Sequence, residues 1–425
     1  MKKKLLNILF WSVISAAFIG PGTITTASLA GASHGVSLLW ALLFSTLACM
    51  VLQEGAARIT IASGLTIGEA VTLTFGNQLW MKWLLGGAVI FGCAAYEAGN
   101  IVGAISGAGL LFPLPPWVFT VAITIIAAVL LWGGSAGSIA KSVGVLVAVM
   151  GVAFLYTSFF IDESPVAIAQ GLFIPQIPSD DILLVIGLIG TTIVPYNLFL
   201  GSGLGKGQQL GEMRLGLIIA IGLGGIVSMA VLLSGTLSSL PFSFEGMATV
   251  LEKAVGLPGK FLFAIGLFAA GFTSTITAPL ASAITAQSIW GKGAKKWEAT
   301  GINYRLVWAG ILIVGLVFGL LGLRPVPVIL LAQAINGVLL PVAATGLLLV
   351  LNNTRLMVNQ INGAFSNVAG LLIVGVTLFL GIHQVARAIF MAIGYESSFD
   401  SLYFATVSLL ALLPLIWLGI RIFRR

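Results

Sequence analysis

Side chains able to do chemistry are scarce in this sequence, and the acidic ones inside apolar stretches stand out. Glu54 and Glu97 lie within long apolar runs, where ionisable residues are functional candidates by default. Glu54 precedes Arg58 by four residues, so it either forms a helical ion pair or takes part in ion coupling. Glu97 has no basic residue nearby and is predicted to carry a proton or to be a carboxyl kept neutral.

Three consecutive hydroxyl residues, Thr273, Ser274 and Thr275, offer a different coupling chemistry. Together with backbone carbonyls just before Gly20, two of them could bind sodium. The alternative is that these hydroxyls bond back to their own helix turn, as membrane Ser and Thr commonly do.

Other polar residues have plainer interpretations. Gln333 and Asn336, flanked by apolar residues, are predicted to hydrogen-bond between helices, with gating as an alternative. His34 and His383 are predicted to lie in outward-facing, solvated loops. Two cysteines, Cys49 and Cys93, fall in apolar runs and are interpreted as inert packing thiols.

The composition decides the class of protein. Of the 425 residues, 59% are hydrophobic and only 8% are charged, whereas soluble domains have about a quarter charged residues. The chain is therefore a polytopic membrane protein. Its net charge of +7 comes from short loops, so nucleic acid is not an expected partner. With no nucleophile–base pair and no nucleotide-binding loop, neither an enzyme, a cofactor nor an ATP-driven pump is indicated.

Apolar runs of membrane length predict twelve helices. The expected spans are 8–33, 36–62, 81–107, 116–134, 139–160, 181–204, 213–238, 259–290, 303–323, 327–351, 363–382 and 402–422. Twelve spans put both termini on one side, and that side carries 16 of the 20 Lys and Arg residues. Basic loops face the cytoplasm, which predicts cytoplasmic termini in a bacterial-type inner membrane. The basic start and uncleaved apolar run of the first 20 residues indicate a membrane helix rather than a signal peptide.

Two of these spans are interrupted by proline. The first contains Gly20-Pro21-Gly22-Thr23, and the sixth contains Pro195 at the centre of IGLIGTTIVPYNLFLGSGL. Each interruption lies in the first helix of a block of five. Paired, broken first helices indicate two inverted repeats around a midplane binding site, because unwound backbone at this depth must line a cavity or be buried. Two unrelated proline kinks are the alternative.

Several segments resemble the NRAMP divalent-metal transporters. GPGTITTASLAGASHGVSLLW (20–40) is similar to the signature of the family's first helix, and VLQEGAARITIASGLTIGEA (51–70) to its second helix and following loop. GTTIVPYNLFLGSGL (190–204), GFTSTITAPLA (271–281) and the stretch 333–341 resemble its sixth, eighth and tenth helices. The resemblance implies an all-α, LeuT-like fold in one transmembrane domain, 1–425. Its repeats would be 1–160 and 181–351, with two further helices in 363–425.

The resemblance also shows where this sequence departs from the family. Family ligands to the metal are an aspartate, an asparagine and a methionine, and the matching residues here are Gly20, Thr23 and Val194. Two family histidines and two acidic residues of the third helix match Tyr196, Gly201, Glu97 and Asn100. The scaffold is thus expected to persist without the metal site.

The groups around the breaks carry no charge, which disfavours a dehydrated divalent ion. Exposed half-helix N-termini instead favour an anionic group. Glycines would open the backbone to a solute, hydroxyls would bond it and a valine would form an apolar wall. The predicted substrate-binding residues are Gly20, Pro21, Gly22, Thr23, Val194, Pro195, Tyr196 and Asn197.

The sequence therefore favours a secondary-active transporter in the lipid bilayer. Its predicted cargo is a small organic solute, such as an amino acid or another carboxylate, moved by alternating access with H⁺ or Na⁺ as coupling ion. One alternative is a proton-coupled divalent-cation transporter with a remodelled site, for example for hydrated magnesium. A second alternative is a non-transporting membrane sensor with the same fold.

Overall fold

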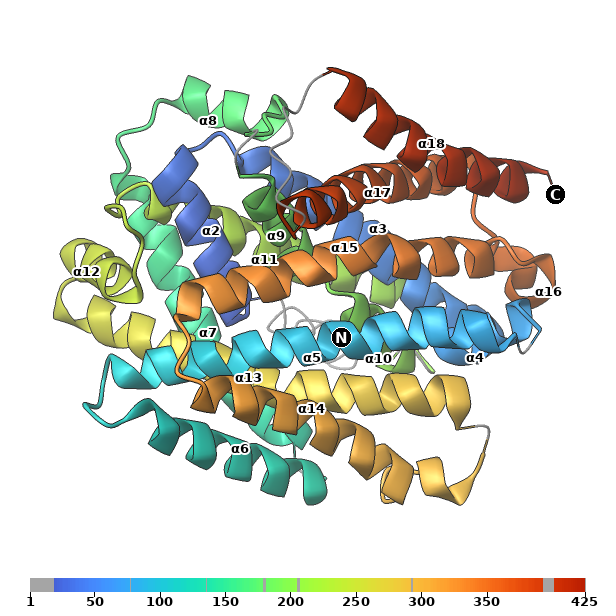
Figure 1. Cartoon of the computed structure of the whole chain (residues 1–425), viewed down its shortest axis with the longest axis horizontal. Coiled ribbons are helices and arrows are strands. Elements are labelled where there is room, and N and C mark those ends of the chain that lie inside the picture. Colours follow the sequence, from blue (N-terminus) through green and yellow to red (C-terminus); the bar gives the residue numbers. More distant parts are fainter. Residues whose placement is uncertain are drawn as a thin grey trace.

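The computed structural model describes residues 19–76, 78–134, 136–178, 181–204, 207–291, 293–392 and 401–424. Helices run through these ranges, and several of the longest lie side by side, while shorter helices are tilted against them (Figure 1). Their bounds are α2 (Pro21–His34), α3 (Leu39–Ser63), α4 (Ile67–Thr74), α5 (Leu79–Gly109), α6 (Pro116–Trp132), α7 (Ala136–Thr157), α8 (Pro165–Phe173), α9 (Ile182–Thr192), α10 (Pro195–Leu204), α11 (Leu210–Gly235), α12 (Phe244–Val255), α13 (Leu257–Trp290), α14 (Ile302–Leu320), α15 (Pro325–Leu351), α16 (Thr354–Met357), α17 (Ala364–Ala392) and α18 (Ser401–Phe423).

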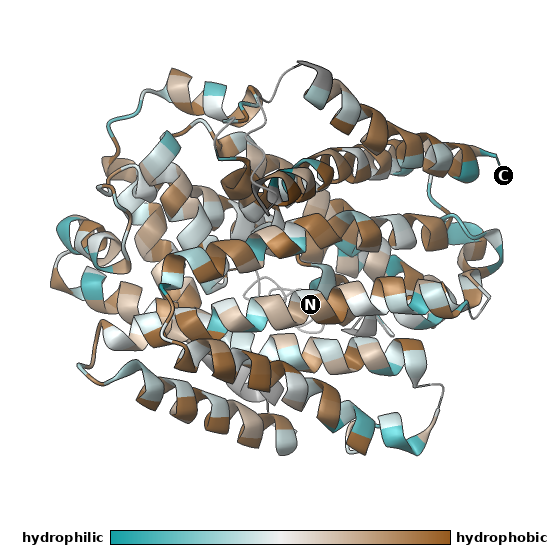
Figure 2. Ribbon diagram, in the orientation of Figure 1, coloured by the Kyte–Doolittle hydropathy of each residue, from teal (hydrophilic) through white to brown (hydrophobic). Residues whose placement is uncertain are grey.

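Most of the expected membrane spans are confirmed. Within the described ranges, nine helical segments are long and apolar enough to cross a bilayer, and α6 and the apolar part of α7 are shorter candidates. The start of the first expected span, 8–18, lies outside the described residues, and its second half is α2. Residues of high hydropathy dominate the outer helices α6, α14 and α18, while many hydrophilic residues lie near the helix ends (Figure 2). A bilayer-embedded bundle requires this distribution.

Short helices outside the expected spans correct the sequence prediction. The segment after the second span is not only a loop, because α4 begins at a capping box in which Thr66 and Glu69 satisfy each other's backbone groups. Helices α8 and α12 each start at a serine whose side chain accepts a backbone N–H bond. These helices are too short to span a membrane, so a search for apolar runs passes over them.

The packing follows the pattern of two inverted repeats. Helix α2 of the first block packs along α11, the second helix of the other block. Reciprocally, α3 packs along α10, which belongs to the broken first helix of the second block. The third helices of the two blocks, α5 and α13, lie against each other over a long contact. Such reciprocal pairing is what a pseudo-two-fold axis between the repeats produces.

Glycines allow α5 and α13 to approach closely. A Cβ atom on Gly271 of α13 would lie 2.5 Å from the backbone nitrogen of Ala104, and one on Gly107 of α5 would lie 2.3 Å from that of Phe268. Since each obstacle is helix backbone, no rotamer change makes room for a side chain. Small residues at such contacts are how membrane helices pack.

Replacing Gly271 with valine should therefore destabilise the fold. Overpacking costs about 1–3 kcal/mol, so the detergent-purified variant should melt several degrees lower by thermal denaturation. Gly109→Val is the matched control, because nothing lies within 4 Å of a Cβ atom at that position. Equal melting temperatures of the two variants would show that the α5–α13 contact is not a tight one.

Candidate substrate site at the two helix breaks

The first break lies at the N-terminus of α2. Gly20 is the N-cap, with an extended backbone (φ −88°, ψ 176°), and no side chain caps this helix end. Pro21 follows at the first helical position and has no N–H to leave unpaired. The buried N-terminus of α2 thus presents backbone N–H groups of Gly22 and Thr23 toward the protein interior.

The second break separates α9 from α10. Helix α9 ends at Thr192, Ile193 leaves helical geometry (φ −101°, ψ 85°), and Pro195 begins α10. Because Pro195 has no N–H, the carbonyl of Thr191, four residues earlier, loses its helical donor. This break therefore offers a carbonyl at the end of α9 beside the start of α10.

The structure brings the two breaks together. The hydroxyls of Thr23 and Thr191 lie 3.0 Å apart and share a buried hydrogen bond between α2 and α9. The sequence predicted Thr23 as a site residue, whereas Thr191 was not among the predicted binding residues. This direct contact between residues 168 positions apart places both breaks at one site.

Gln333 of α15 belongs to the same site, although the sequence predicted interhelical hydrogen bonding or gating for it and not a place at the breaks. A Cβ atom on Gly22 would lie 2.1 Å from its Nε2, so the amide rests against the N-terminus of α2. The side chain is buried, and neither of its polar atoms has a hydrogen-bond partner in the part of the chain that is described. Buried amides are normally paired, so this one is available to a substrate or to water.

Asn336, one turn along α15, does bond between helices. Its Nδ2 donates to the carbonyl of Gly92 in α5 at 3.3 Å and to that of Ala332 at 3.2 Å. The prediction of an interhelical hydrogen bond is confirmed for Asn336.

Aromatic residues form the wall of the second break. Tyr196 of α10 meets Tyr96 of α5 edge to face at 5.6 Å between ring centroids. The hydroxyl of Tyr96 donates to the carbonyl of Gly190 at 2.8 Å, which ties α5 to the last turn of α9. Val194 and Asn197 are buried beside them. No hydrogen bond reaches either polar atom of the Asn197 amide from the described residues.

The three hydroxyls of α13 divide into different environments. The Oγ of Ser274 would lie 3.5 Å from a Cβ atom on Gly20, so this residue faces the first break. Thr273 donates back to the carbonyl of Ala269 at 2.9 Å. Thr275 is fully buried, and its hydroxyl has no partner in the described ranges. Of these three residues, Ser274 is the one whose hydroxyl lies beside Gly20.

Glu97 lies close to the site but is turned toward a neighbouring helix. It is 0% exposed, and a Cβ atom on Gly315 of α14 would lie 3.2 Å from its Oε1. Neither carboxyl oxygen has a hydrogen-bond partner among the described residues. An ionised carboxylate here would lack compensation within these ranges.

Glu54 is remote from the breaks. It pairs with Arg58 at 3.2 Å, as its helical spacing predicted, and also with Arg214 of α11 at 2.8 Å. The second partner comes from 160 residues away and was not anticipated.

The two histidines differ from their prediction as solvated loop residues. His34 is the last residue of α2, and its Nε2 lies 3.0 Å from Oδ2 of Asp181, the residue before α9. His383 is buried inside α17, which continues ten residues beyond the expected end at 382. The apolar residues Val385 and Ile389 lie in the extended part of α17, so the helix end predicted at 382 was too early.

The site chemistry is that of neutral oxygen and nitrogen donors. Hydroxyls, two unpaired amides and backbone groups converge at the breaks, and in the described part of the chain no three His, Cys, Asp or Glu residues cluster. Such donors can hold a hydrated hard cation or a hydrogen-bonding solute. They do not form the soft, charged ligand sets preferred by transition metals.

Comparison with known proteins identifies the family. Residues 12–387 match the family model described as natural resistance-associated macrophage protein-like. The chain belongs to the NRAMP family. Because this is a family of membrane transporters, the chain is a multi-pass transporter and not an enzyme.

Individual NRAMP relatives extend this result. The chain is 24% identical over 391 residues to "Divalent metal cation transporter MntH" of Pectobacterium carotovorum, covering 87% of this chain and 92% of the relative. The protein of that name from Bacillus subtilis is 24% identical over 405 residues, covering 87% and 90%. A manganese transporter of Eremococcus coleocola, solved with an aromatic bis-isothiourea substituted compound, superposes with a TM-score of 0.74 at 21% identity, covering 100% of this chain and 96% of that one. This confirms the LeuT-like NRAMP fold.

Proposed function

We propose that the chain is a secondary-active transporter of a divalent metal cation, which it carries through the two helix breaks with part of the ion's water shell. The main support is the hydrogen bond between Thr23 and Thr191, which brings the two helix breaks together. The chain belongs to the NRAMP family, whose members are membrane transporters. The relatives named as divalent metal cation transporters support this cargo. None of those quoted supports the organic solute that the sequence favoured.

The donor set selects among divalent ions. Magnesium prefers oxygen ligands, loses its waters reluctantly and is usually held by few protein groups. Retained water would also lower the cost of a double charge among uncharged side chains. The hydroxyls of Thr23 and Thr191 and the amides of Asn197 and Gln333 supply such oxygens. We therefore place a hydrated hard cation of the magnesium type ahead of manganese, iron or cadmium.

A small organic solute remains the second candidate. It is favoured by Gly20, Thr23 and Val194 at the family's ligand positions, because none of them carries charge and Gly20 has no side chain. A carboxylate could bond to the N–H groups there.

A thermal-shift titration of the purified protein separates the two cargoes. A ligand at 100 times its dissociation constant adds about 2.7 kcal/mol to stability. We expect stabilisation by millimolar magnesium and none by amino acids or small carboxylic acids at equal ionic strength. Stabilisation by an organic acid alone would replace the proposed cargo with the second candidate.

We further propose that Glu97 carries the coupling proton. It is the buried acid nearest to the site, one residue beyond Tyr96, which contacts both Tyr196 and Gly190. In Glu97→Gln proteoliposomes, uptake down a concentration gradient should persist but should no longer respond to an imposed pH gradient. Accumulation driven by pH in this variant would exclude the role, and a dependence on sodium would shift attention to Ser274 and its neighbours.

A further inference from the structure

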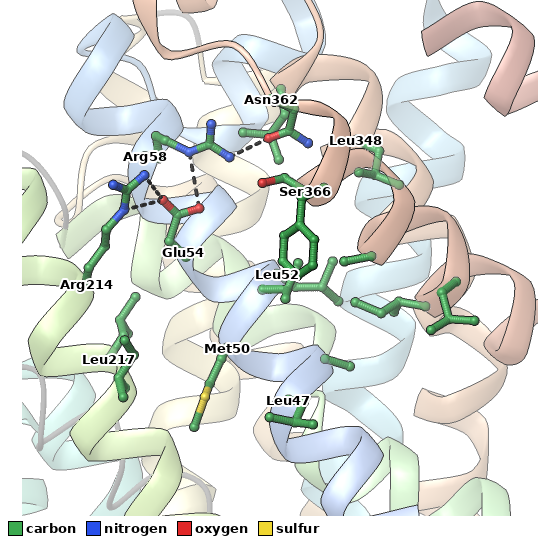
Figure 3. A pocket seen from close by; sticks show the side chains of 18 of the residues that line it. Leu47, Met50, Leu52, Glu54, Arg58, Arg214, Leu217, Leu348, Asn362 and Ser366 are labelled. Carbon is green, nitrogen blue, oxygen red and sulfur yellow. Dashed lines mark hydrogen bonds and ion pairs between the residues drawn. The ribbon is translucent and has the colours of Figure 1, made fainter. Parts of the chain in front are cut away.

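A groove of about 560 Å³ opens between α3, α11 and α17, with Leu348 and Leu351 of α15 also lining it (Figure 3). None of its lining residues belongs to the two breaks. All three helices contain candidate membrane spans, so the groove faces the bilayer. Apolar residues line most of it, among them Phe44, Leu47, Ile218 and Leu372. Several of these side chains are exposed in the protein alone. Within a membrane, lipid is what covers such a surface.

One end of the groove is polar and carries excess positive charge. Arg58 donates to Glu54 and to the carbonyl of Gln360, and its Nη2 donates to Asn362. Arg214 also pairs with Glu54, while its side chain remains 49% exposed. One carboxylate thus faces two guanidinium groups, which leaves one positive charge at the rim (Figure 3).

The length of the groove matches one leaflet. Glu54 and Phe44 both line it and stand ten residues apart on α3, a distance of about 15 Å at the α-helical rise. Half of a hydrocarbon core about 30 Å thick is the same length. The polar end lies at the end of α3 that leads into α4, the side predicted to be cytoplasmic.

From this geometry we infer a binding site for an anionic phospholipid. One acyl chain lies in the groove, and the headgroup phosphate accepts hydrogen bonds from the exposed guanidinium of Arg214, with the hydroxyl of Ser366 at the same rim. The phosphate supplies the negative charge that Glu54 alone does not, and guanidinium–phosphate pairs are strong and directional. The lipid site lies outside the transport path, so lipid binding is expected whichever cargo passes through the breaks.

Native mass spectrometry of the detergent-purified protein tests the site. The probes are phosphatidylglycerol and phosphatidylcholine with identical acyl chains. We expect phosphatidylglycerol to be retained more strongly by wild type and about fivefold less by Arg214→Gln, the ratio that about 1 kcal/mol per basic residue near an anionic surface gives. Arg305→Gln is the control of equal charge change, because Arg305 stacks on Trp132 elsewhere in the chain.

A second pair of variants tests the groove itself. Ala369→Trp should block the acyl chain and reduce retention of both lipids, because Ala369 lines the groove. Val368→Trp, on the adjacent exposed position, should leave retention unchanged. Equal retention of the two lipids by wild type, no change in Arg214→Gln, or equal effects of the two tryptophans would each overturn the proposal. A second copy of the chain in place of lipid, seen as a dimer that Ala369→Trp dissociates, would overturn it as well.

Discussion

Gly22→Leu is expected to abolish uptake while leaving the protein folded. Even the first atom of a new side chain would lie 2.1 Å from Nε2 and 2.3 Å from Cδ of Gln333. The flexible end of Gln333 can move, so the fold should survive, but the leucine then fills the space where α2 meets α15. Transport should drop below detection in proteoliposomes, with the same gel-filtration profile as wild type.

Gly20→Ala is the matched control for this experiment. The nearest atom to a Cβ at Gly20 is the Oγ of Ser274 at 3.5 Å, an ordinary contact, so uptake should largely persist. Unchanged uptake in Gly22→Leu would move the substrate path away from the breaks.

Restoring the three family ligands should create a transition-metal site. The variant is Gly20→Asp, Thr23→Asn and Val194→Met, which joins a hard carboxylate and amide to a soft thioether. The Cβ atom of the new aspartate would meet Oγ of Ser274 at 3.5 Å, an ordinary contact. We expect manganese affinity by calorimetry to rise at least about hundredfold, because even outer-shell partners of metal ligands are worth about 10–100-fold.

The matching neutral variant carries Gly20→Asn with the same other two changes. It keeps the shape and removes the charge, so it should regain little manganese affinity. If wild type itself bound manganese at micromolar concentration, neutral donors would suffice for a transition metal and the preference for a hydrated hard ion would be wrong.

Membrane spans were predictable because an apolar run of about 20 residues has few other uses. The two breaks were equally visible, since proline beside glycine removes both a donor and stiffness. The short helices could also have been found. Thr66 and Glu69 show the capping-box spacing that starts α4, and the buried Phe244, Met247 and Leu251 recur at helical intervals in α12.

Long-range partners could not be predicted in this way. No local sequence pattern indicates that the amide of Gln333 contacts Gly22 or that Arg214 pairs with Glu54. Each contact depends on how two helices that are distant in sequence cross. The same limit applies to Glu97, whose isolation was visible but whose neighbour, Gly315, was not. The identity of the substrate could not be predicted from sequence patterns either, because neutral hydrogen-bonding groups can bind more than one kind of cargo.

Uptake by wild-type protein in proteoliposomes tests whether the chain carries a divalent cation through the two helix breaks. Vesicles loaded with a magnesium indicator would receive magnesium outside, with manganese, amino acids and small carboxylic acids as competitors in parallel. We predict saturable magnesium entry that Gly22→Leu eliminates and that organic solutes do not inhibit. Absence of divalent-cation entry, together with uptake of a labelled carboxylate that Gly22→Leu blocks, would contradict it.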